Sequence, residues 1–89
     1  ENKMILQKES LASLAVKLER KYDVVIRFAD EDTKNFRFSG TLLDETIQQV
    51  LDAIMLSSPI RYSIEGKVIT IYENLSMKER FREHLKQLK

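Results

Sequence analysis

The sequence predicts an α+β fold in which the elements follow the order β-α-β-β-α-β-β, with a further helix at the C-terminus. Apolar residues recur at helical spacing in two internal segments and in the tail. Short β-branched or alternating runs lie between them, as is typical of strands. The chain has 89 residues, 43% apolar and 33% charged, which suits one globular domain with a thin core. We expect residues 1–73 to form this domain and residues 74–89 to form a separate amphipathic helix.

A short strand and a helix are predicted at the N-terminus. Residues 4–6 form an apolar run, and the helix is expected from Ser10 to Tyr22. Its apolar face carries Leu11, Leu14, Ala15 and Leu18, and Ala12 and Val16 widen this face. A face this wide indicates that the helix is covered on more than one side.

Two strands and a second helix follow. Residues 24–28 form a β-branched run, residues 29–35 a polar loop, and residues 36–39 an alternating strand that Gly40 ends. Asp44 is expected to cap the second helix by accepting a backbone N–H bond. The buried face of this helix carries Ile47, Val50, Leu51 and Ile54, and Ser57-Ser58-Pro59 ends the helix.

A β-hairpin is predicted from residues 60–64 and 68–72, with Glu65 and Gly66 in a two-residue turn. This register places Ile64 opposite Lys67. Paired residues share one face of a sheet, so alternation divides the side chains into two sets. The inward set is Ile60, Tyr62, Ile64, Ile69 and Ile71, and the outward set is Arg61, Ser63, Val68, Thr70 and Tyr72.

The tail from Asn74 is predicted to form a third helix, which opens with a capping box at Ser76 and Glu79. Its five basic and two acidic residues give it a net charge of +3. Since the whole chain has a net charge of +1, the rest of the chain has a net charge of −2. We expect this helix to pack on its own domain or to form a homodimer through residues 75–89, rather than to bind a membrane surface. The apolar stripe of the tail is Met77, Phe81, Leu85 and Leu88.

Three stretches, residues 18–24, 36–42 and 58–71, carry a resemblance to a known family. They resemble, in order, the end of the first helix, the Arg-Phe-x-Gly-Thr segment and the closing hairpin of the C-terminal domain of FecR-like anti-sigma factors. The match covers roughly residues 4–72. This domain is similar in turn to the short N-terminal signalling domain of TonB-dependent transducers and secretins. The resemblance implies that two helices lie on or between small β-sheets.

The resemblance also implies a signalling function without catalysis. FecR-like proteins span the inner membrane, hold an extracytoplasmic-function sigma factor at their cytoplasmic end, and contact an outer-membrane TonB-dependent transducer with their periplasmic end. The chain would be the terminal part of that periplasmic region. It begins at Glu1, so we expect a processed or excised segment whose membrane anchor and sigma-binding region lie outside it.

Two other functions compete with this interpretation. The first is the N-terminal signalling domain of the transducer itself, which shares the architecture. The Arg-Phe-Ser-Gly-Thr segment (37–41) and the Ser-Pro-Ile-Arg-Tyr segment (58–62) favour the anti-sigma side. The second is a small acylphosphatase-like enzyme, which would need an anion-binding loop that the sequence does not offer.

No catalytic, cofactor-binding or metal site is predicted. The chain has no cysteine and one histidine, His84, which argues against a thiol nucleophile and against a zinc site. The acidic run 30–32 lacks the EF-hand pattern, because Lys34 and Asn35 stand at the fifth and sixth positions. The aromatic strand 36–38 lacks the flanking glycines of an RNA-binding sheet, so no nucleic-acid partner is expected.

Partner binding is predicted at outward strand positions. Arg27, Arg37 and Arg61 fall on such positions by alternation, and with Tyr72 they form a candidate patch. Arginine and tyrosine are enriched among interface anchors. The patch requires that the three arginine-bearing strands lie in one sheet. Addition of a partner strand to an open sheet edge is the second mode that we expect.

Overall fold

The computed structural model describes residues 3–74 of the chain, and these residues show the predicted order β-α-β-β-α-β-β. The predicted helix at 74–89 lies outside the described residues, apart from Asn74. The elements are β1 (Met4–Ser10), α1 (Leu11–Tyr22), β2 (Val25–Phe28), a 3₁₀ turn η1 (Glu31–Asn35), β3 (Arg37–Leu42), α2 (Ile47–Ser57), β4 (Ile60–Glu65) and β5 (Val68–Glu73). No described helix has the length and apolar character needed to cross a membrane.

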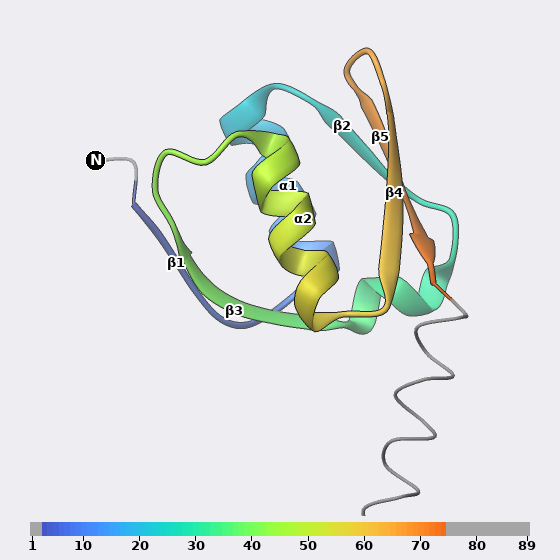
Figure 1. Ribbon diagram of the computed structural model, residues 1–89, viewed down its shortest axis with the longest axis horizontal. Coiled ribbons are helices and arrows are strands. Elements are labelled where there is room, and N and C mark those ends of the chain that lie inside the picture. The colour runs from blue at the N-terminus through green and yellow to red at the C-terminus, as the bar shows by residue number, and fades with distance from the viewer. Residues whose placement is uncertain (1–2, 75–89) are drawn as a thin grey trace, which may run out of the picture.

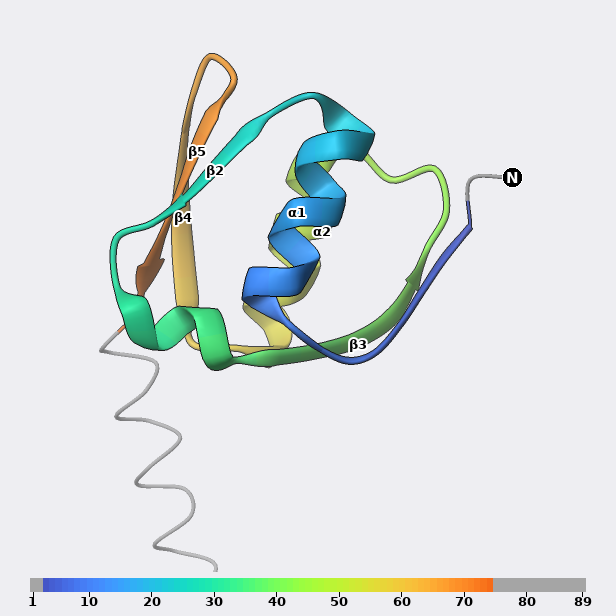
Figure 2. The same ribbon diagram turned by 180° about the vertical axis from the view of Figure 1, so that it is seen from behind.

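The strands form two separate small sheets. β1 and β3 pair antiparallel, while β2, β5 and β4 form a three-stranded sheet in that order. Within this second sheet β2 runs parallel to the central strand β5, and β4 runs antiparallel to it. Figures 1 and 2 show α1 and α2 one behind the other, between the two sheets. The expectation of two helices between small sheets is therefore confirmed.

The core lies where the helices meet the inner faces of both sheets. All four residues predicted for the apolar face of α1 are buried, and so are three of the four predicted for α2, with Ile47 half-buried. Val16, which was expected to widen the face of α1, is 48% exposed. The buried apolar side chains are Leu6, Leu11, Leu14, Ala15, Leu18, Ile26, Phe38, Leu42, Val50, Leu51, Ile54, Ile60, Ile69 and Ile71. Every helix and strand of the described chain, apart from the short turn η1, contributes to this set.

Side chains and backbone groups close both ends of α1. At its start the Ser10 hydroxyl accepts a hydrogen bond from the Ser13 amide at 3.2 Å. At its end Asp23 adopts a left-handed conformation with φ of 56°, and the Val24 amide donates to the Glu19 carbonyl at 3.3 Å. This turn directs the chain back along the helix into β2.

The cap predicted for α2 was wrong, because Thr46 and not Asp44 holds that position. The Thr46 hydroxyl accepts from the Gln49 amide at 3.1 Å, and the Gln49 side chain accepts from the Thr46 amide at 2.9 Å. This reciprocal capping box fixes the helix start at Ile47. The Glu45 carboxylate accepts the Leu43 amide at 2.6 Å, and this contact shapes the connection before the helix. The predicted end at Ser57-Ser58-Pro59 is confirmed.

The hairpin turn also differs from the prediction, since its two central residues are Gly66 and Lys67. Gly66 has φ of 60°, and a two-residue turn of this hand takes glycine at its first central position. The pairs are therefore Ile64 with Ile69 and Tyr62 with Ile71, a shift of two residues. Because side chains alternate with a period of two, this shift leaves every side chain on its predicted face.

The segment at residues 29–35 is more ordered than the polar loop that the sequence predicted. It contains η1, and Thr33 in this turn is fully buried. The Thr33 hydroxyl donates to the Asp30 carbonyl at 2.6 Å, and the Asp30 carboxylate accepts the Glu73 amide at 2.8 Å. Asp30 thus ties this segment to the end of β5 instead of facing only solvent.

The capping geometry of α2 leads to a stability prediction. Replacing Thr46 with alanine removes the hydroxyl that accepts the Gln49 amide, and we expect the free energy of unfolding to fall by about 1 kcal/mol. The matched variant Asp44→Ala should change it by less than about half of that, as is usual for exposed surface positions. Urea unfolding of both variants measures the difference. An equal loss in the two variants would contradict the assignment of Thr46 as the cap.

Candidate protein-binding surface

The outer face of the three-stranded sheet brings together three of the four predicted binding residues. Arg27 on β2 lies beside Thr70 on β5, and Arg61 on β4 pairs directly with Tyr72 on β5. The Arg61 guanidinium lies over the Tyr72 ring, 4.7 Å from its centroid. Both arginines are exposed, and the alternation of each strand turns them away from the helices. A cation–π contact of this kind holds Arg61 in one orientation.

Arg37 does not belong to this face, so the predicted grouping of three arginines is wrong. It lies on β3, in the other sheet. The pairing register of β1 with β3 shifts between Leu6 and Glu9, and Lys8 in this interval has a φ of 49°. Such a shift is a β-bulge. The Arg37 guanidinium donates to the Lys8 carbonyl at 3.1 Å, and the Ser39 hydroxyl accepts the Lys8 amide at 2.8 Å. Arg37 therefore stabilises a β-bulge.

A cluster of charges lies beside this bulge. The Glu9 carboxylate accepts a hydrogen bond from the Ser13 hydroxyl and pairs with the Lys17 ammonium at 2.9 Å. The Ser13 hydrogen bond, then the bond and charge of Lys17 and the charge of Arg37, hold the pKa of Glu9 below its ordinary value of 4.5. These contacts join the end of β1 to the first two turns of α1.

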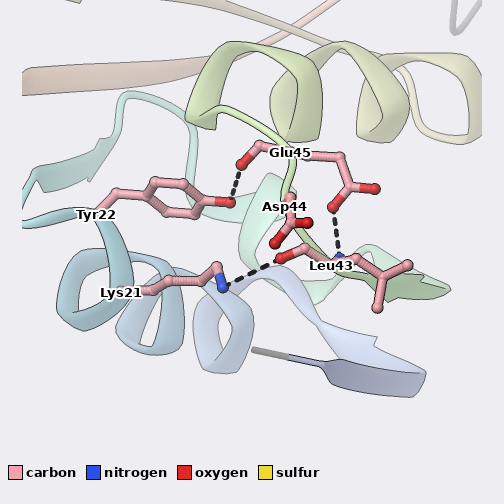
Figure 3. A pocket seen from close by; sticks show the side chains of 5 residues that line it. All are labelled: Lys21, Tyr22, Leu43, Asp44 and Glu45. Atoms are coloured by element: carbon pink, nitrogen blue, oxygen red, sulfur yellow. Dashed lines mark hydrogen bonds between the residues drawn. The ribbon is translucent and has the colours of Figure 1, made fainter. Parts of the chain in front are cut away.

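A hollow lies between the end of α1 and the connection from β3 to α2 (Figure 3). The Tyr22 hydroxyl donates to the Glu45 carbonyl at 2.6 Å, and the Lys21 ammonium reaches the Leu43 carbonyl at 3.5 Å. Burial, followed by the nearby charges of Glu45 and Asp44, raises the pKa of Tyr22 above 10.0. Tyr22 is therefore a protonated donor near neutral pH, and its hydroxyl anchors the connection.

Residues 3–74 contain no group of three or more His, Cys, Asp or Glu side chains placed to hold a metal ion. In the hollow of Figure 3, the hydroxyl of Tyr22 and the carboxylate of Glu45 each bond to a backbone group. Tyr22 and Glu45 thus fix the chain around this hollow.

The two edges of the three-stranded sheet differ. On the β2 edge the Ile26 amide donates to the Glu19 carboxylate at 2.8 Å, and α1 thereby occupies this edge. At the β4 edge no further strand pairs with the sheet among residues 3–74. Natural sheets often cover an edge with another element, as α1 covers β2 here, because free N–H and C=O groups attract other strands. Within the part of the chain that the structure describes, this sheet thus leaves its outer face and its β4 edge uncovered.

Two small sheets around a pair of helices define a small α+β domain, and the outer face of its larger sheet carries Arg27, Arg61 and Tyr72. Residues 3–71 match the family described as FecR, C-terminal, and the chain belongs to this family. Anti-sigma factors of this family act in signalling and are in general not catalysts.

The chain is similar to two crystal structures from Parabacteroides distasonis ATCC 8503, each of a protein assigned as an anti-sigma factor. One has a TM-score of 0.73 and 25% sequence identity, and the match covers 80% of this chain and 34% of that protein. The other has a TM-score of 0.71 and 26% identity, with 80% and 33% covered. The chain thus spans about a third of the length of these proteins. No curated protein matches it.

Sequence reasoning missed three contacts that define the surfaces. It placed Arg37 outward without its bulge partner, and it did not find the Glu19 bond that closes the β2 edge. It also gave no sign of the stacking between Arg61 and Tyr72, because the predicted hairpin register was shifted by two residues. A turn with glycine at its first central position would have placed these two residues opposite each other.

The β-bulge at Lys8 predicts that loss of Arg37 destabilises the fold more than loss of Arg27 does. The variant Arg37→Ala loses a charge-assisted bond to the Lys8 carbonyl, so we expect the free energy of unfolding to fall by about 0.5–1.5 kcal/mol. Arg27→Ala removes an exposed side chain from the outer face and should change it by less than about 0.5 kcal/mol. Thermal unfolding of both variants provides the test. A larger loss for Arg27→Ala would refute the structural role of Arg37.

The Glu9 cluster leads to a pH dependence. Because the pKa of Glu9 is lowered in the folded chain, its contacts stabilise the fold above the ordinary value of 4.5 and are lost as the pH falls through the lowered value. We therefore expect the wild type to exceed Glu9→Gln in unfolding free energy at pH 7, and the gap to close in acid below pH 4.5. Unfolding curves across this range measure it. A gap that stays constant down to strong acid would show that the charge of Glu9 has no such effect.

Proposed function

We propose that this chain is the protein-binding module of a FecR-type anti-sigma factor. In this proposal it receives a signal from an outer-membrane TonB-dependent transducer, and an extracytoplasmic-function sigma factor is held by a cytoplasmic region outside this chain. The observation that carries the proposal is the family match over residues 3–71, which spans nearly all of the described fold. The module acts by contact and has no catalytic role.

The proposal places the domain in the periplasm, as part of a protein that is anchored in the inner membrane by another segment. The match to about a third of two longer anti-sigma factors supports a module within a larger protein. The absence of cysteine is compatible with this compartment, since a two-sheet core needs no disulfide when it is well packed.

The outer face of the three-stranded sheet is the proposed contact surface for the transducer. Arg27, Arg61 and Tyr72 project from it, and they are the side-chain types that most often anchor interfaces. The stacking of Arg61 on Tyr72 already restricts the arginine in the free domain, which lowers the entropy lost on binding. Addition of a transducer strand to a sheet edge is the alternative mode of contact.

A second candidate is the signalling domain of the transducer itself, because that domain shares the two-helix, two-sheet architecture. The family match and both similar crystal structures favour the anti-sigma side. The parent gene distinguishes them: a membrane span and cytoplasmic helices before this domain support the anti-sigma factor, and a plug and barrel after it support the transducer.

The contact surface can be tested by titration with the purified signalling domain of the transducer encoded beside this protein. Each of Arg27→Ala, Arg61→Ala and Tyr72→Ala should raise the dissociation constant, by roughly tenfold or more at an anchor position. Arg37→Ala is the matched control and should leave it unchanged, since this arginine lies on the other sheet.

Three outcomes separate the models. Unchanged affinity in all three outer-face variants would remove the proposed face and leave strand addition, which depends on backbone bonds. Equal weakening by Arg37→Ala would show a general effect of charge instead of a defined face. No binding to any transducer domain by the folded wild type would count against the proposed function itself.

A further inference from the structure

The backbone of β4 leaves two residues with their polar groups turned to an open edge. The Asn74 amide donates to the Pro59 carbonyl at 2.8 Å. This bond shows which residues of β4 are the hydrogen-bonded positions of the ladder with β5. Since an antiparallel strand directs alternate residues to opposite sides, Arg61, Ser63 and Glu65 bond to β5. Residues 62 and 64 therefore direct their N–H and C=O groups away from the sheet. Figure 1 shows β4 as the strand of this sheet nearest the viewer.

The opposite edge of the same sheet is closed by α1. The Val25 amide donates to the Lys67 carbonyl at 2.8 Å, so the Ile26 amide faces the other way, where the Glu19 carboxylate accepts it at 2.8 Å. An incoming strand would have to displace this charged side chain from β2. Between the two edges of this sheet, β4 is thus the one that can accept a strand.

The sequence of β4 is self-complementary when two copies run antiparallel about Ser63. Tyr62 of one copy then forms a hydrogen-bonded pair with Ile64 of the other. The two-fold axis generates a second such pair, between Ile64 of the first copy and Tyr62 of the second. Ser63 faces its own copy across the two-fold axis, and its hydroxyl can donate or accept there. This register uses all four free backbone groups of each copy, and no other antiparallel register pairs residues 62 and 64 completely.

The charges on the outer side of β4 fit the same register. Arg61 of one copy lies opposite Glu65 of the other, and this happens twice in the pair. Such non-hydrogen-bonded positions bring side chains closest together, and opposite charges there are stabilising. Among residues 3–74 neither Arg61 nor Glu65 forms an ion pair within the chain. In this register a second copy would place an opposite charge beside each of them.

We propose that two copies of this chain associate through antiparallel pairing of their β4 strands about Ser63, which joins the two three-stranded sheets into one of six strands. The register places both outer faces on the same side, so the dimer presents two stacked Arg61–Tyr72 pairs together. This inference rests on the edge of β4 and needs no transducer, although the dimer would occupy the same edge that addition of a transducer strand to this sheet would use.

The test is a charge exchange on the full chain, with sedimentation or light scattering over a concentration series up to the millimolar range. We expect a concentration-dependent dimer of the wild type. R61E and E65R should each raise its dissociation constant about tenfold or more, because both cross-strand pairs become like-charged. The double variant R61E/E65R should return the dissociation constant to the wild-type value, and so should an equal mixture of the two single variants. R27E makes the same charge change away from this edge and should have no effect.

A backbone variant tests the hydrogen bonds separately. Ile64→Pro removes an N–H that faces the open edge and takes no part in pairing with β5, so the hairpin should persist while the dimer is lost. Circular dichroism checks its fold, and the charge variants decide the matter if this variant does not fold. A wild type that stays monomeric throughout would overturn the inference. So would a dimer that resists every β4 change and disappears when residues 75–89 are removed.

Discussion

The whole arrangement depends on the burial of one helix pair from two sides at once. The two sheets share no strand, so no ladder of hydrogen bonds holds them together. α1 packs against β1 and β2, and α2 packs against β3 and β4, so each helix touches both sheets. Burial of an aliphatic side chain contributes roughly 1.5–3 kcal/mol, and this apolar layer is what connects the two halves.

Polar contacts then secure the ends of the apolar layer. Tyr22 and Asp30 each bond to a backbone group in a segment that is distant in the sequence, and Glu19 bonds to the Ile26 amide just after the turn that follows α1. No buried side-chain nitrogen or oxygen among the described residues lacks a hydrogen-bond partner. Because an unsatisfied buried polar group is costly, this complete pairing gives one defined position to the connections between elements. The outer face of the three-stranded sheet is therefore displayed on a fixed support.

The strand β4 takes part in both of the proposed contacts. Its outward side chains extend the basic and aromatic face, on which Arg61 is held by Tyr72. Its backbone forms the open edge at residues 62 and 64. The proposed role depends on contact with another protein, which requires exposed surfaces of this kind more than an enclosed pocket. The inner faces of both sheets pack into the core, and the outer face of the three-stranded sheet stays exposed.

The sequence alone determined the features that depend on neighbouring residues. Periodicity placed both helices and all five strands in order, and it assigned each hairpin side chain to its correct face even though the turn was shifted. It placed the cap at Asp44 instead of Thr46, although Thr46 and Gln49 stand at the spacing of a capping box. It could not find the parallel pairing of β2 with β5, the bulge that holds Arg37, or the edge contact of Glu19. The Glu19 contact depends on how the chain turns back from α1 into β2. The strand pairing and the bulge depend on which distant strands become neighbours, and that choice follows from how two sheets together cover the apolar faces of the helices.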